Sequence, residues 1–186
     1  MSNLKDRDRP LLAVLIDADN VPAKHAANIM REVTTIGEPA LRRVYGDWSN
    51  GHLKSWKEPI HALGLVARQE TSNTTGKNAT DIGLVIDAMD ILHFGKFDGF
   101  VIVSSDSDFT ALVNRLREDG LNVIGIGEEK TNPALRGVFR ADGSWLLFGA
   151  VLVLAPSTVV RRNLSTTVPI VADKLFHYRL WTNQAV

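Results

Sequence analysis

Four aspartates stand at or just after the ends of apolar segments in this sequence, and a fifth stands just before one. They are Asp17 and Asp19 in "LIDADN", Asp81 in "NATDIGL", and Asp106 and Asp108 in "VSSDSDF". Carboxylates held close together repel one another and raise one another's pKa unless a cation neutralises them. A set of oxygen ligands without His or Cys selects a hard ion such as Mg²⁺ or Mn²⁺. If the fold brings these aspartates together, they predict metal-assisted phosphodiester or phosphate chemistry.

The apolar pattern predicts a fold that does bring them together. Short apolar runs of strand length alternate with amphipathic stretches of helix length between residues 11 and 126. The expected strands cover residues 11–16, 41–46, 64–67, 99–103 and 121–126, and the expected helices cover residues 21–35, 51–62, 80–93 and 108–119. This alternation predicts right-handed crossovers and a three-layer α/β/α domain around a mostly parallel sheet of roughly five strands.

In such domains, ligands bind at the carboxyl ends of the strands, because loops and helix N-termini converge there. Asp17 and Asp19 follow the first expected strand, and Asp106 and Asp108 follow the fourth. Asp81 opens the third expected helix. The winding of the chain therefore predicts that all five carboxylates point into one crevice.

The same residues also have simpler interpretations. Asp81 and Asp108 occupy first-turn positions of expected helices, where a carboxylate accepts backbone N–H bonds and suits the helix dipole. Lys77 and Asn78 precede the third helix, where they could contact the phosphates of a nucleic acid or only solvent. A basic rim with stacking aromatics is a further expectation, although most of these aromatics would serve the core. Its members are Arg42, Arg43, Lys54, Lys57, Arg68, Tyr45, Trp48 and Trp56.

Other polar groups carry weaker signals. Asp87 and Asp90 lie inside the third expected helix and are expected to be solvated, although Asp87 could turn toward the site. The histidines show no spacing typical of metal ligands. The segment "TTGKN" lacks the first glycine and the final Ser or Thr of a phosphate-binding loop, so that motif is rejected.

The composition excludes several classes of protein. Lys and Arg (21) balance Asp and Glu (21), so a polyanion would have to meet a local patch. With no cysteine, the chain has no disulfide framework, zinc–thiolate site or cysteine nucleophile. The charged opening does not resemble a secretory signal, and the longest apolar run, residues 145–155, is too short for a membrane-spanning helix. We expect a soluble cytoplasmic protein with no membrane partner.

Five segments of the chain resemble, in order, the NYN domain of the LabA-like family, a branch of the PIN-like nuclease fold. They are "LLAVLIDADNVP", "YGDW", "GKNATDIGLVIDAMDIL", "GFVIVSSDSDFTALVNRLREDGLNVIGIG" and "ALR", within residues 10–137. The resemblance implies a Mg²⁺- or Mn²⁺-dependent ribonuclease. Its catalytic, metal-holding cluster would be Asp17, Asp81, Asp106 and Asp108. Its supporting polar residues would be Asp19, Asn20 and Ser105.

The expected organisation has three parts. Residues 1–9 form an N-terminal tail, residues 10–150 the nuclease domain, and residues 151–186 a diverged or aberrant C-terminal extension. After "EEKTNPALR" the family continues with a further helix and a short strand, and the sequence from residue 137 resembles neither. We therefore expect a departure from the family fold at this end, with the acidic cluster untouched.

Three functions fit these observations. The first is a metal-dependent endoribonuclease that hydrolyses phosphodiester bonds of single-stranded or structured RNA, with homo-oligomer formation left open. The second is a haloacid-dehalogenase-like phosphatase, because "DAD", a lysine and "SDSD" follow that order, with Asp17 as nucleophile and Asp19 as acid. Against it, "DADN" leads directly into helix-like sequence and leaves no obvious flap. The third is a non-catalytic RNA-binding scaffold whose acidic pocket is unused.

Overall fold

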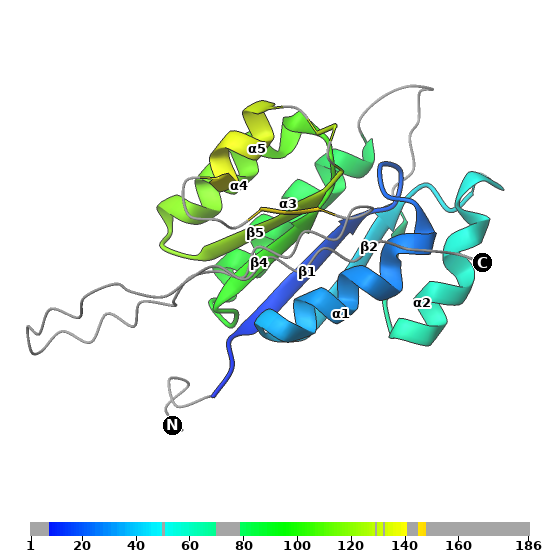
Figure 1. Cartoon of the computed structure of the whole chain (residues 1–186), viewed down its shortest axis with the longest axis horizontal. Helices are drawn as coiled ribbons and strands as arrows, with labels where there is room; N and C mark the ends of the chain where they lie inside the picture. The colour runs from blue at the N-terminus through cyan, green and yellow to red at the C-terminus, as the bar shows by residue number, and fades with distance from the viewer. Residues whose placement is uncertain are drawn as a thin grey trace, which may run out of the picture.

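In the part of the chain that the structure describes, the sheet contains six strands, all parallel, in the order β3-β2-β1-β4-β5-β6 (Figure 1). The computed structural model describes residues 8–49, 51–69, 79–128, 130–131, 133–140 and 145–147. Helices cover both faces of the sheet, so the predicted three-layer α/β/α fold is confirmed. A short sixth strand adds to those that were expected.

The strands lie close to their predicted positions. They are β1 (Leu11–Asp17), β2 (Glu38–Gly46), β3 (Val66–Gln69), β4 (Gly99–Val103), β5 (Asn122–Gly127) and β6 (Trp145–Leu147). β1 and β4 form the central pair, and every residue in both is buried. β3 lies at one edge, and all of its residues are exposed. It begins later than predicted because Gly64, with a φ of 60°, still belongs to the end of the preceding helix.

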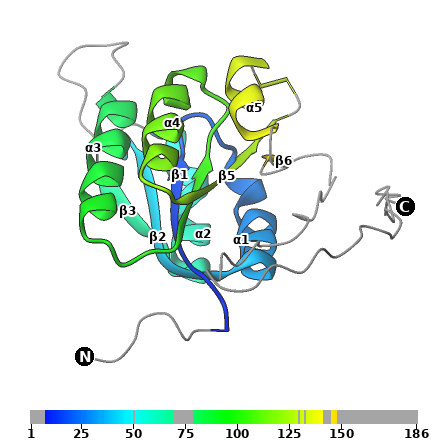
Figure 2. The same ribbon diagram turned by 90° about the vertical axis from the view of Figure 1, so that its left-hand side faces the viewer.

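The helices alternate with the strands along the chain. They are α1 (Ala26–Ile36), α2 (Lys57–Leu63), α3 (Ala79–His93), α4 (Thr110–Glu118) and α5 (Pro133–Arg140). Short 3₁₀ turns precede three of them, namely η1 (Ala23–His25), η2 (Gly51–Trp56) and η3 (Ser107–Phe109). Figure 2 shows α1 and α2 on one side of the sheet and α3 and α4 on the other. No helix in the described part of the chain is long and apolar enough to cross a membrane.

The two faces of the sheet bury separate apolar clusters. Successive side chains of a strand point to opposite faces. In β1, Val14 and Ile16 therefore join the cluster beneath α1 and α2, whereas Ala13 and Leu15 join the cluster beneath α3 and α4. The same alternation directs the side chain of Asp17 toward α3 and α4. Burial of this apolar surface is the main favourable term that holds the layers together.

The C-terminal part of the domain differs from the expectation. The helix α5 begins at Pro133, inside "EEKTNPALR", and continues to Arg140, and the short strand β6 follows it, so the expectation that the sequence from residue 137 forms neither a helix nor a strand is wrong. Leu135, Val138 and Phe139 recur at helical spacing and pack against the cluster beneath α3 and α4, which explains why this segment is helical. Leu146 of β6 joins the opposite cluster. The extension at 151–186 lies outside the described residues.

A buried ionic contact joins α3 to the sheet. Asp87 of α3 is only 9% exposed, so the expectation that it is solvated is wrong. Its Oδ1 accepts a hydrogen bond from Arg43, and its Oδ2 accepts one from the Tyr45 hydroxyl. Arg68 of β3 lies 3.9 Å from the same carboxylate. Burial, followed by the hydrogen bond to Asp87, raises the pKa of Tyr45, so the hydroxyl remains a donor. The contact holds α3 in place against β2.

Replacement of Asp87 by alanine should destabilise the fold by about 3 kcal/mol, because it leaves the Arg43 charge and the Tyr45 hydroxyl without their partner. Urea unfolding measures this change. The matched control is Asp90→Ala on the exposed face of the same helix, which should change stability by no more than about 0.5 kcal/mol. Equal effects of the two substitutions would contradict the role assigned to Asp87.

Candidate active site

Asp17 forms the floor of the candidate site. It ends β1 and is fully buried. Its Oδ2 accepts hydrogen bonds from Asn20 Nδ2 at 2.7 Å and from Ser104 Oγ at 2.8 Å. Its Oδ1 accepts the backbone N–H groups of Asp19 and Asn20 at 3.1 and 3.3 Å. Because Ser104 directly follows β4, this carboxylate joins the ends of the two central strands.

The hydrogen bonds of Asp17 counteract the cost of its burial. Removal from water disfavours the charged form of a carboxylate and raises the pKa of Asp17. The hydrogen bonds from Asn20 and Ser104 favour the charged form and lower it. Burial is the larger effect, so the net direction is upward. The hydrogen bonds from Asn20 and Ser104 therefore favour the charged form of Asp17 against the effect of its burial.

Asp19 connects the end of β1 to the start of α3. Its side chain is exposed, and its Oδ2 accepts a hydrogen bond from Thr80 Oγ1 at 2.7 Å. Thr80 is buried in the first turn of α3, and Asp81 is the next residue. The contact therefore brings the first turn of α3, which carries Asp81, to the end of β1.

The segment after β4 supplies two more carboxylates. Asp106 caps η3, and its Oδ1 accepts the backbone N–H of Asp108 at 2.9 Å. The backbone N–H of Asp106 in turn donates to Ser104 Oγ at 3.0 Å. Ser105 Oγ accepts the N–H of Glu128 at 3.0 Å, which fixes this segment to the end of β5. Asp106 is therefore the residue that caps η3, and this cap uses only one of its two carboxylate oxygens.

Asp81 lies in the combined field of the other carboxylates. Partial burial, followed by the charges of Asp17, Asp106, Asp108 and Asp19, raises the pKa of Asp81 to about 6. In the fold, Asp17 ends β1, Asp106 and Asp108 follow β4, and Asp81 lies in the first turn of α3. Their mutual repulsion is unfavourable, and a cation would relieve it.

The donor set fits a hard divalent ion. Among the described residues, no three Asp, Glu or His side chains are already gathered tightly enough to hold a metal ion. Asp81 and Asp106 are half-buried and Asp108 is exposed, so these carboxylates are open to solvent, whereas Asp17 is not. Mg²⁺ commonly uses only one or two carboxylates and keeps several waters. The fit to a hard ion therefore rests on the type of ligand, because the solvent-accessible donors of the site are carboxylate oxygens.

Some expected nucleic-acid contacts cannot take part. Tyr45 and Trp56 are 0% and 1% exposed, so neither can stack on a base. Arg43 is engaged by Asp87. Lys77 and Asn78 lie outside the described residues. Sequence reasoning assigned no role to Ser104, although a hydroxyl directly after the buried strand "GFVIV" was a signal that could have identified it.

Comparisons with known proteins identify the family of the chain and a solved structure with a similar fold. The model of the NYN domain matches residues 11–140, so the chain belongs to the NYN domain family, whose members are generally nucleases. No curated protein matches the chain. The fold is similar to the crystal structure of a protein of unknown function, VPA0982 from Vibrio parahaemolyticus RIMD 2210633. The TM-score is 0.61 and the sequence identity is 17%, and the match covers 76% of this chain and 94% of that one.

Substitution of Asp81 by asparagine should stabilise the metal-free protein at pH 7. The pKa of Asp81 lies above its ordinary value of 3.8 in the folded state, so its ionisation opposes folding as the pH rises from about 4 to about 6. We expect a gain of about 1 kcal/mol, reduced by solvent screening of this half-buried group.

Urea unfolding in EDTA between pH 4 and pH 7.5 measures the effect. The advantage of Asp81→Asn over wild type should be small at pH 4 and reach its full size above pH 6. Asp90→Asn on the exposed face of α3 is the control and should show no such trend. A variant whose advantage does not grow with pH would show that the carboxylates do not interact.

Proposed function

We propose that this NYN protein is a metal-dependent endoribonuclease of the LabA-like type that hydrolyses RNA phosphodiester bonds. The observation that carries the proposal is the contact between Thr80 and Asp19, which holds the first turn of α3, and with it Asp81, at the carboxyl end of β1. RNA is itself anionic, so this end of the sheet would repel it unless a cation intervened. Family membership supports nuclease chemistry.

The roles of the residues follow from their exposure and hydrogen bonds. Asp81, Asp106 and Asp108 would hold Mg²⁺ or Mn²⁺, and Asp17 below them would add its charge. When bound, the ion would offset the carboxylate charge and polarise the phosphodiester. Asn20 and Ser104 keep Asp17 oriented, and Asp19 keeps the start of α3 at the site through Thr80. Ser105 holds the segment that carries Asp106 and Asp108.

The burial of Asp17 argues against the phosphatase alternative. An aspartyl nucleophile needs an oxygen that can reach a phosphorus atom. Asp17 is fully buried, and each of its oxygens accepts two hydrogen bonds. A phosphoryl group could attach to it only after Asn20 and Ser104 moved away. Tight binding of beryllium fluoride at Asp17 would favour the phosphatase instead.

Cleavage of labelled single-stranded and hairpin RNA should require Mg²⁺ or Mn²⁺ and stop in EDTA. Asp81→Asn and Asp106→Asn should each lower the rate on the order of 10²-fold, because each removes charge that positions the ion. Gel-resolved product formation over time measures these rates.

The matched control is Asp90→Asn, which changes the same chemical group on the exposed face of α3 and should cleave at the wild-type rate. Undiminished cleavage in EDTA would contradict the proposal. RNA binding without cleavage under any metal condition would favour the scaffold alternative.

A further inference from the structure

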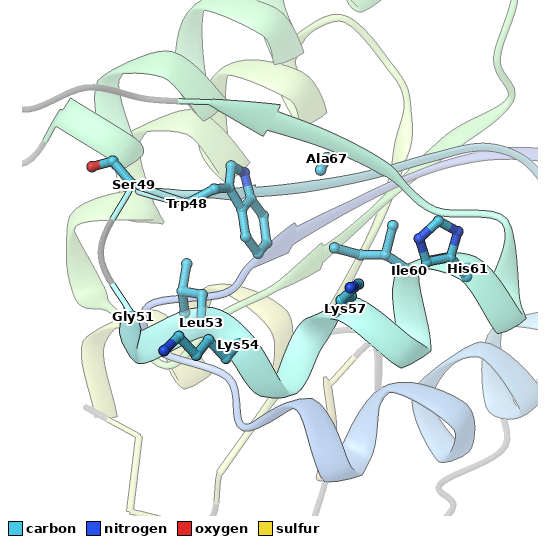
Figure 3. A pocket seen from close by; sticks show the side chains of 9 residues that line it. All are labelled: Trp48, Ser49, Gly51, Leu53, Lys54, Lys57, Ile60, His61 and Ala67. Atoms are coloured by element: carbon cyan, nitrogen blue, oxygen red, sulfur yellow. The ribbon is translucent and has the colours of Figure 1, made fainter.

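A pocket of ≈ 510 Å³ lies between β3 and the η2–α2 segment. It is lined by Trp48, Ser49, Gly51, Leu53, Lys54, Lys57, Ile60, His61 and Ala67 (Figure 3). None of these residues belongs to the acidic site, and none carries negative charge. The volume falls in the range of small-molecule sites, which is about 300–1,000 Å³.

The apolar walls of the pocket are held in place by the fold. Trp48 follows β2, and its indole Nε1 donates to the Arg68 carbonyl at 2.8 Å. Its backbone N–H donates to the Gln69 side chain at 3.1 Å. Leu53 of η2 packs over Gly46, where an added Cβ would lie only 2.4 Å from Leu53 Cδ1. The glycine therefore lets η2 approach the sheet, and the partly exposed indole keeps one orientation beside the pocket (Figure 3).

The polar groups of the pocket are cationic or neutral. Lys54 and Lys57 come from η2 and α2, and His61 lies in the last turn of α2. Both lysines are exposed, and within the described part of the chain neither forms an ion pair with a carboxylate. Ammonium groups of this kind contact phosphate as point charges. The pocket thus combines a flat aromatic wall with two cations.

We propose that this pocket binds one nucleotide unit of a single-stranded RNA, a subsite that rests on the proposed ribonuclease function. The base would stack on Trp48, and Lys54 and Lys57 would contact the flanking phosphates. An aromatic surface beside cationic side chains is the combination that binds single strands without reading their sequence. The pocket therefore supplies a local positive surface on a chain whose net charge is zero.

The position of the pocket suits a strand that also reaches the acidic site. Trp48 follows the end of β2, and β2 pairs with β1 so that Tyr45 stands beside Asp17. The pocket and the acidic cluster thus begin at the carboxyl ends of neighbouring strands. Trp48 packs with the cluster beneath α1 and α2, whereas Asp17 faces α3 and α4. A bound strand would pass over the end of the sheet from one face to the other.

The test is equilibrium binding of a fluorescein-labelled, phosphorothioate-linked oligouridylate in Mg²⁺. The ion offsets the charge of the acidic site, and the phosphorothioate linkages keep the phosphate charge but resist cleavage. Lys54→Ala/Lys57→Ala should weaken binding at least tenfold and reduce the slope of log Kd against log salt by about 1.4, the loss of two phosphate contacts on a single strand. Trp48→Leu should weaken binding roughly tenfold and leave the salt slope unchanged, because stacking releases no counterions.

Lys96→Ala is the matched control, because Lys96 is an exposed lysine in the loop before β4, at the opposite end of the sheet. It should bind as wild type does. Unchanged binding and salt slope in the double lysine variant would overturn the proposal. Binding of inorganic phosphate or free uridine monophosphate as tightly as the oligonucleotide would also overturn the proposal. Thermal unfolding checks that Trp48→Leu is folded, and the lysine variants test the pocket without touching its core.

The two proposals fail separately. If metal-dependent cleavage is found but the lysine variants bind RNA normally, the subsite is wrong and the nuclease assignment stands. If no cleavage occurs but binding depends on Lys54, Lys57 and Trp48 as stated, the subsite stands and the protein binds RNA without cutting it.

Discussion

Repulsion among carboxylates at one end of the sheet is the constraint that the surrounding structure must meet. Asp17, Asp81 and Asp106 come from three different elements, and their charges oppose the fold that brings them together. Hydrogen bonds from Asn20 and Ser104 hold the buried Asp17 carboxyl group in place, and the contact between Thr80 and Asp19 holds the start of α3. The apolar clusters on both faces supply the free energy that makes this crowding tolerable.

A second ionic contact supports the same arrangement from further down α3. Asp87 is held by Arg43 and Tyr45 of β2, so α3 is fixed to the sheet at two points along one face. The two contacts differ in kind. The contact between Thr80 and Asp19 joins a neutral group to a charged one at the end of the sheet. The contact between Asp87 and Arg43 is a partly buried ion pair. Such a pair gives little net stability compared with apolar packing, but it defines where the helix lies.

Much of the fold and of the acidic site could be predicted from the sequence. The segments that form β1 and β4 are nearly continuous apolar runs, as is typical of buried parallel strands. The residues that follow such strands stand at the carboxyl end of the sheet, however the helices pack. The helix α5 was missed because its apolar residues span only two turns. The burial of Asp87 and the enclosure of Asp17 depend on partners 44 and 87 residues away in the chain, and periodicity carries no information on such pairs.

The central place of β1 and β4 has a consequence for how the molecule opens. The sheet ends in the short, exposed strand β3 on one side and, in the part of the chain described, in the three-residue strand β6 on the other. Local unfolding begins where few apolar contacts protect the backbone. Amide hydrogens at both edges should therefore exchange with solvent early, while those of β1 and β4 exchange only on global unfolding. The pocket beside β3 lies in the readily opened part of the molecule, and the acidic cluster lies on its most persistent part.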